Sequence, residues 1–171
     1  MFLQIQQLQL EPIRFEETHQ PGVIDFFDPQ LRQVAPLAAS GRAELSEALM
    51  EIRVRGHVST TMEVACDRCL ELAHLPIDTD FDLVYRPAAY SPPGDEVNIT
   101  GTETEVGFYE GEGLELTDVL REQVLLSIPM LRVCREDCKG ICPVCGQNRN
   151  AAQCQCHAVA SDDRWADLKN L

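Results

Sequence analysis

Residues 50–70 read "MEIRVRGHVSTTMEVACDRCL", and their apolar and polar side chains alternate up to the first cysteine. A period of two is typical of a β-strand that buries one face. Such a strand would be long for one flat element, and Gly56 is where we expect a bend or bulge to relieve it. The segment "ASGRAELSEA", residues 39–48, precedes it as the expected partner strand. The even positions carry the apolar face: Met50, Ile52, Val54, Gly56, Val58, Thr60, Met62, Val64 and Cys66.

A second alternating segment follows the "CDRC" motif of Cys66 and Cys69. Leu70 and Leu72 keep the even parity of the first strand, whereas the later apolar residues fall on odd positions. Because a change of parity turns side chains to the other face, we expect a bulge or bend near residues 73–76. Two long strands would then form an antiparallel hairpin with "CDRC" at its turn. The odd apolar positions are Leu75, Ile77, Phe81, Leu83 and Tyr85.

The remaining segments have weaker patterns. Residues 1–10 alternate loosely and suggest a short strand. Residues 87–114 are rich in proline, glycine and acidic side chains, which favours a loop with short strands at most. Residues 115–128 carry apolar side chains on one helical stripe, and Pro129 would end that helix. The closing "SDDRWADLKNL" is typical of a short terminal helix.

Together these patterns predict an α+β fold. A curled antiparallel β-sheet of about four to six strands would pack against one helix. A C-terminal cysteine-rich zinc module and a short terminal helix would follow. We expect two parts in the chain: an α+β body over residues 1–133, and a zinc-binding module with the C-terminal helix over residues 134–171, packed on the body.

Eight cysteines carry the clearest chemical signal, and six of them lie within residues 134–156. Zinc prefers four ligands in a tetrahedron, and thiolates at C-x2-C spacing are typical of its structural sites. The run "CPVCG" has this spacing, and its glycine permits the positive φ that such a turn needs. We therefore predict a first site from Cys142, Cys145, Cys154 and Cys156. The other four cysteines would form a second site: Cys66, Cys69, Cys134 and Cys138.

The spacing leaves other uses of the cysteines open. The hairpin pair could instead join Cys142 and Cys145, and His157 could replace one cysteine as a ligand. Cys66 lies on the apolar face of its strand, where a small buried hydrophobic residue is an equally ordinary role. A redox function of Cys66 and Cys69 would need an accessible thiolate with a low pKa, and the neighbouring Asp67 would raise that pKa.

The chain of 171 residues carries a net charge of −14. Phosphate backbones repel so acidic a protein, so charge does not favour direct RNA contact. Lys and Arg are absent from residues 87–120, which instead hold eight acidic residues. This segment is either a solvated face or a docking surface for a basic protein. Those acids are Asp95, Glu96, Glu103, Glu105, Glu110, Glu112, Glu115 and Asp118.

Several classes of protein are not indicated. No apolar run is long enough to span a membrane, and the start lacks the features of a secretory signal, so we expect a cytoplasmic protein. The sequence has no Ser/His/Asp set, phosphate loop or HExxH motif, so we expect neither an enzyme nor a small-molecule substrate. In the cytoplasm, clustered cysteines more often bind metal or exchange electrons than form stable disulfides.

Several motifs in this order resemble one family. "CDRCL" between long strands, "LLSIP", "CREDCKGICPVCGQNRN", "CQC" and "DDRWADLKNL" resemble the YceD-like large ribosomal RNA subunit accumulation proteins of bacteria. The resemblance covers roughly residues 50–171 and is loose before them. It identifies Cys66, Arg68 and Cys69 as family-defining positions. Some family members lack the later cysteines, which implies that the later cluster is structural and dispensable to the shared activity.

The resemblance implies a cytoplasmic, non-enzymatic factor that maintains large-subunit ribosomal RNA. Its partner would be a basic ribosomal protein or ribosome-assembly factor held by the acidic segment 87–120. Two alternatives stay open at this point. One is a thiol redox protein or redox-regulated chaperone using Cys66 and Cys69, and the other is a zinc-stabilised RNA-binding protein.

Overall fold

The structure is a computed structural model, and it describes residues 1–90 and 106–156. The described chain forms two compact units. The first comprises Met1–Val64 and His74–Met130. The second comprises Ala65–Ala73 together with the chain from Leu131 onward. The tip of the hairpin that begins in the first unit therefore belongs with the cysteine-rich segment.

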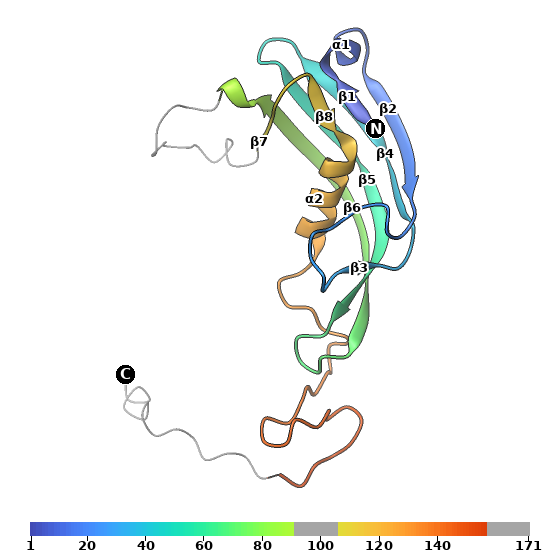
Figure 1. The fold of residues 1–171 in the computed structure, drawn as a ribbon, viewed down its shortest axis with the longest axis vertical. Helices are drawn as coiled ribbons and strands as arrows, with labels where there is room; N and C mark the ends of the chain where they lie inside the picture. The colour runs from blue at the N-terminus through green and yellow to red at the C-terminus, as the bar shows by residue number, and fades with distance from the viewer. Residues whose placement is uncertain (91–105, 157–171) are drawn as a thin grey trace, which may run out of the picture. The chain divides into compact units, whose positions relative to one another are not determined.

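The first unit is built mainly of β-sheet. Its six-stranded sheet has the order β2 (Ile13–His19), β4 (Leu37–Ser46), β5 (Glu51–Ala65), β6 (Leu72–Pro87) and β7 (Val106–Tyr109), with β3 (Arg32–Gln33) paired to β5 (Figure 1). The pairs β2–β4, β4–β5 and β3–β5 are antiparallel. The pair β6–β7 is parallel, so the expectation of a wholly antiparallel sheet is corrected there. The curl expected of the sheet is not confirmed.

Two α-helices are present in the described residues, so the expectation of one helix before the terminal segment is not confirmed. The longer, α2 (Leu116–Ser127), buries Leu116, Val119, Leu120 and Val124 in the same core as the sheet. The shorter, α1 (Ile5–Leu8), follows β1 (Phe2–Gln4) directly. β1 pairs with β8 (Gly113–Glu115), and a 3-10 turn, η1, spans Ala88–Tyr90. The expected terminal helix over residues 161–171 lies outside the described residues.

Buried and less buried side chains alternate along β5, and the buried ones are the even positions that the sequence predicted. Ile52, Val54, Val58 and Met62 are fully buried, while the odd positions face outward or lie partly buried. Leu70 and Leu72, which suggested a bulge, are 66% and 67% exposed. β6 runs without interruption from its first residue, and its buried positions are odd. The change of parity therefore arises because Leu70 and Leu72 do not belong to the core.

Gly56 has a packing role, and β5 pairs with β4 through it without the bulge that was one of the two expectations. It lies opposite Gly41 on β4, and β5 is continuous through it. A Cβ atom at Gly56 would come within 2.9 Å of the Phe81 ring, and one at Gly41 within 2.6 Å of the Phe15 ring. The two aromatic rings thus occupy the space that side chains at these positions would fill.

Candidate metal centres

The two C-x2-C motifs, Cys66–Cys69 and Cys142–Cys145, form the same type of backbone turn. In the first, Leu70 N–H donates to the Cys66 carbonyl at 2.8 Å, and Cys66 N–H donates to the Glu71 carbonyl at 2.9 Å. Leu70 has φ 63, a left-handed conformation that glycine adopts more readily. This turn carries both sulfurs of the "CDRC" motif to one side of the hairpin tip.

The "CPVCG" motif repeats this geometry. Gly146 N–H donates to the Cys142 carbonyl at 2.8 Å, and Cys142 N–H donates to the Gln147 carbonyl at 2.8 Å. Gly146 has φ 72, so it stands where Leu70 stands in the first turn. The sequence signal was strong for this turn because glycine marks the position, and weaker for "CDRCL" because leucine occupies it.

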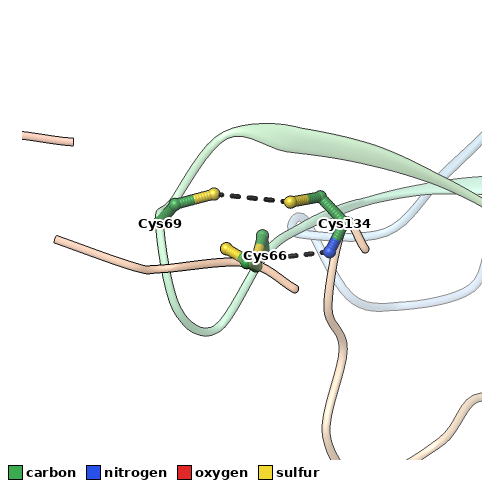
Figure 2. Close-up of side chains that lie close together, drawn as sticks. Cys66, Cys69 and Cys134 are labelled. Atoms are coloured by element: carbon green, nitrogen blue, oxygen red, sulfur yellow. Dashed lines mark hydrogen bonds between the residues drawn. The ribbon is translucent and has the colours of Figure 1, made fainter. Parts of the chain in front are cut away.

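Four sulfur atoms meet at the hairpin tip. We call Cys66, Cys69, Cys134 and Cys138 the inner cluster, and their sulfurs all lie within 4.8 Å of one another. Cys66 is 0% exposed, Cys69 4% and Cys138 6%. Figure 2 shows three of these residues, with Cys134 N–H donating to the Cys66 sulfur at 3.3 Å. Asn150 Nδ2 donates to the Cys138 sulfur, also at 3.3 Å.

Asp67 and Arg68, which lie between Cys66 and Cys69, bind the segment that carries Cys134 and Cys138. Asp67 N–H donates to the Arg132 carbonyl at 2.8 Å, and the Asp67 carboxylate accepts the Arg132 N–H at 2.6 Å. The Arg68 guanidinium donates to the Glu136 and Cys138 carbonyls, each at 3.2 Å. Arg68 therefore has a structural role that the sequence pattern did not reveal.

Gly140 brings the next segment close to the same turn. It has φ 68, and a Cβ atom there would lie 2.9 Å from the Arg68 carbonyl oxygen. That carbonyl accepts the Ile141 N–H at 3.0 Å. A larger residue at position 140 would push this segment away from the Arg68 carbonyl. Glycine is therefore required here for both its φ and its size.

The spacing of the inner sulfurs fits a tetrahedral metal site. A zinc ion with Zn–S bonds of about 2.3 Å has ligand sulfurs about 3.8 Å apart along each edge of the tetrahedron. The Cys69–Cys134 sulfurs are 3.7 Å apart and the Cys66–Cys138 sulfurs 3.9 Å apart. A disulfide would need about 2.05 Å between sulfurs. The arrangement therefore matches a ligand set better than a pair of disulfides.

The thiols of the inner cluster differ in acidity. Burial opposes ionisation of Cys66, but the N–H groups of Cys134, Cys69 and Arg68 outweigh it and lower its pKa to about 6. The side-chain amide of Asn150 is the main cause of a lowered pKa at Cys138. Burial and the neighbouring sulfurs raise the pKa of Cys134 to about 12. A divalent cation would offset the repulsion that holds this last proton in place.

The outer cluster is more open to solvent. It comprises Cys142, Cys145, Cys154 and Cys156, whose sulfurs also lie within 4.8 Å of one another. Cys142 is buried and Cys154 partly buried, but Cys145 and Cys156 are exposed. The backbone N–H groups of Cys145 and Val144 lower the pKa of Cys142 to about 6, in parallel with Cys66. Hydrogen bonding with Cys145 raises the pKa of Cys156 to about 12.

A hollow of about 470 Å³ lies beside the outer cluster. Lys139 and Arg149 line it together with Cys142, Cys154 and Cys156. Within residues 1–90 and 106–156, neither Lys139 nor Arg149 forms an ion pair. Two cations beside a set of thiolates reduce the net negative charge that four sulfur ligands and one divalent ion would carry.

All eight predicted site residues lie in these two clusters, in the same two sets of four that the sequence analysis proposed. The alternative that joined the hairpin pair to Cys142 and Cys145 does not correspond to this arrangement. His157 lies outside the described residues. The other histidines are elsewhere: His19 lies 2.9 Å from Glu17, His57 2.9 Å from Asp80, and His74 3.3 Å from Glu63.

Each set of four cysteines could hold a metal ion. All-thiolate sets are typical of structural zinc sites, which leave no coordination position for a substrate. Asn150, which contacts an inner-cluster sulfur from the loop of the outer cluster, was not predicted from the sequence. Its position twelve residues after Cys138 carries no motif that would mark it. Across the described part of the chain, no helix has both the length and the apolar character needed to cross a membrane.

Comparisons with known proteins agree on one family. The family described as "Large ribosomal RNA subunit accumulation protein YceD" matches residues 54–171. An uncharacterized protein of Mycobacterium tuberculosis is 30% identical over 91% of this chain and 72% of its own length. The protein YlbN of Bacillus subtilis is 22% identical over 98% of this chain and 92% of its own.

A chloroplast relative carries a more informative name. The Arabidopsis thaliana protein "Large ribosomal RNA subunit accumulation protein YCED homolog 1, chloroplastic" is 25% identical over 71% of this chain and 44% of its own length. No solved structure matches the chain. The family match covers more than half of the chain and includes both cysteine clusters. The chain therefore belongs to the YceD family of large ribosomal RNA subunit accumulation proteins.

Proposed function

We propose that this protein is a cytoplasmic, non-enzymatic accessory factor for the accumulation of large-subunit ribosomal RNA, with structural zinc in both cysteine clusters. Membership of a family named for an accumulation role, not for a reaction, supports the first part. The single observation that carries the second is the pair of four-sulfur clusters, with inner S–S distances near those of a zinc tetrahedron. Zinc would be the organising element of a segment that has few buried apolar side chains of its own.

Burial supports a structural role for the zinc. The second unit has a small apolar cluster, in which Cys66, Cys69 and Cys138 are themselves the buried residues. A unit without a larger apolar core needs another source of stability, and metal binding supplies it in many small domains.

Metal content tests this part of the proposal. The intact chain should carry two zinc ions, and Cys66→Ser and Cys142→Ser should each carry one. Elemental analysis after gel filtration measures the ratio. Full retention of secondary structure with no bound metal, and eight thiols free to alkylate, would contradict the proposal.

We further propose that the protein acts through a basic protein, either a ribosomal protein or an assembly factor. The net charge of −14 supports this, because it disfavours direct contact with RNA phosphates. Within the described residues of the acidic segment, Glu110, Glu112 and Asp118 are exposed. Complementary charge would speed the encounter with a basic partner and make it sensitive to salt.

A salt series separates the partner classes. The protein should retain a basic ribosomal protein at low salt and release it as ionic strength rises. Charge reversal at Glu110 and Glu112 to Lys should weaken retention, whereas Glu47→Lys, at an exposed turn of the first unit, should serve as a control. Recovery of protein-free ribosomal RNA in place of a basic protein would instead favour the RNA-binding alternative.

One observation favours a thiol redox function as a second candidate. Cys66 has a pKa of about 6, as a reactive thiolate would. However, it is 0% exposed, so a substrate disulfide cannot reach its sulfur without opening of the cluster. A metal-free chain with a reversible Cys66–Cys69 disulfide would support this candidate, and tight zinc with few free thiols would exclude it.

A further inference from the structure

The side chain of Asn150 connects the loop of the outer cluster to the inner cluster. Asn150 Nδ2 donates to the Cys138 sulfur at 3.3 Å, while Asn150 Oδ1 accepts the Lys139 N–H at 2.8 Å. Because Oδ1 is committed to a backbone donor, the amide orientation is fixed and the NH₂ group faces the sulfur. Asn150 thus holds both a ligand atom of the inner cluster and the residue that follows it.

The position of Asn150 depends on the fold of the outer loop. Asn150 N–H donates to Asn148 Oδ1 at 2.8 Å, and Ala151 and Ala152 N–H both donate to the Asn148 carbonyl at 3.2 Å. Asn148 also pairs with Ile141 in an isolated antiparallel β-bridge. These contacts form a tight turn between Cys145 and Cys154, the residues at which the loop enters and leaves the outer cluster.

A metal ion in the outer cluster would fix both ends of this loop. Without it, the turn would be held by its own hydrogen bonds and by those to residues 139–142, such as Arg149 N–H donating to the Gly140 carbonyl at 2.9 Å. Most of this segment is exposed, and exposed hydrogen-bonded segments open more readily than buried ones. Asn150 would then spend less time against the Cys138 sulfur. A hydrogen bond to a ligand sulfur stabilises the thiolate that a metal needs, so its loss weakens metal binding at the inner cluster.

We propose that Asn150 couples the two clusters, so that zinc in the outer cluster strengthens zinc binding in the inner one. This inference rests on the proposed binding of zinc. The coupling is reciprocal by thermodynamic necessity, so a filled inner cluster also favours the outer one. Residues that orient a metal ligand are commonly worth about 10–100-fold in metal affinity, and we expect about tenfold here.

The experiment is a double-mutant cycle on zinc affinity of the inner cluster. The outer cluster is removed by the paired change Cys142→Ser and Cys145→Ser, and the amide by Asn150→Ala. Competition with a chelator gives the affinity, and the absorption of Co²⁺ bound to thiolates reports the occupied site. Circular dichroism of each variant checks that the sheet is retained.

Each single change should lower inner-site affinity about tenfold. Together they should lower it no further than either alone, because both remove the same contact. Gln147→Ala is the matched control: it removes an amide side chain from the same loop, and within the described residues that side chain makes no hydrogen bond. Its affinity should equal that of the unsubstituted chain.

Asn150→Asp separates the two roles of the side chain. The carboxylate can still accept the Lys139 N–H, but it places an oxygen against the sulfur instead of an N–H donor. Inner-site affinity should fall at least as far as in Asn150→Ala. Retained affinity in Asn150→Asp would show that donation to the sulfur is not the cause, and would overturn the inference.

The remaining outcomes are also decisive. Additive losses in the cycle, or unchanged affinity in Asn150→Ala, would overturn the coupling and leave the two-zinc proposal standing. A chain that binds no metal at the inner cluster would overturn both proposals. The reciprocal measurement, outer-site affinity in Cys66→Ser with and without Asn150→Ala, must give the same non-additivity.

Discussion

The two clusters should lose their metal at very different rates under attack by a thiol reagent. The perturbation is an excess of a small disulfide reagent added to the zinc-loaded chain. In the outer cluster, Cys145 and Cys156 are exposed to the reagent. In the inner cluster, Cys134 is partly exposed, but Cys66, Cys69 and Cys138 are at most 6% exposed, so the reagent reaches these three sulfurs only after the cluster opens.

The structure sets the size of the difference. Opening the inner cluster breaks at least one N–H···S hydrogen bond, either from Cys134 N–H to Cys66 or from Asn150 to Cys138. Hydrogen bonds to charged groups are worth about 1.5–3 kcal/mol. Since each 1.4 kcal/mol is a factor of about ten, the inner thiols should react about ten- to hundredfold more slowly. The reaction should therefore show a fast phase from the outer cluster and a slow phase from the inner cluster. Each phase should consume four thiols and release one zinc ion.

A chromogenic zinc indicator follows release, and mass spectrometry of alkylated peptides assigns the thiols in each phase. Cys142→Ser should abolish the metal release of the fast phase and keep that of the slow one. A single phase in which all eight thiols react together would refute the reasoning from burial. So would a fast phase that contains Cys66 and Cys138.

Three further predictions concern two glycines and the protons released when zinc binds. Gly41→Ala should destabilise the first unit by about 2 kcal/mol or more in urea unfolding, because its Cβ would collide with the Arg55 carbonyl oxygen and lie 2.6 Å from the Phe15 ring. Gly146→Ala should cost only about 1 kcal/mol, from the positive φ alone, since nothing lies within 4 Å of that Cβ; thermal unfolding of the zinc-loaded chain measures it. Zinc binding at pH 7 should release at least one proton per cluster, because the pKa values of Cys134 and Cys156 are raised to about 12 and both thiols hold their protons in the metal-free chain. Affinity should therefore rise with pH, and calorimetry in buffers of different ionisation enthalpy counts the protons; binding without proton release would contradict the assigned ligands.

Local patterns predicted the parts of the fold that depend on neighbouring residues. The alternation of residues 50–66 identified β5 and its buried face, because burial on one side of a strand repeats every two residues. The apolar residues at helical spacing within residues 115–128 identified α2, because one face of a helix repeats about every 3.6 residues. The C-x2-C spacing of Cys142 and Cys145 suggested the first set of four, since such a turn is formed by consecutive residues, and the remaining four cysteines gave the second set, as the structure groups them.

The features that the sequence did not reveal depend on distant partners. The close packing at Gly56 is set by the Ser40 carbonyl oxygen and by the Phe81 and Phe15 rings, all from other strands, and no local pattern marks these contacts. The parallel pairing of β7 with β6 joins residues 106–109 to residues 84–87, and no local signal marks it. α1 replaced part of an expected strand: Ile5 and Leu8 are spaced for one helical face, and both contact the core, Leu8 buried and Ile5 partly buried.

The separation of the ligands along the chain has a consequence for biosynthesis. The inner cluster joins Cys66 to Cys138, 72 residues apart, whereas the outer cluster draws all its ligands from residues 142–156. Closing the shorter loop costs about 1.4 kcal/mol less chain entropy. As the polypeptide leaves the ribosome, Cys66 and Cys69 emerge first and must wait for partners that are synthesised much later. The outer ligands are made last, but they lie within one short segment and can bind an ion as soon as Cys156 is available, whereas the inner centre also requires two distant segments to meet.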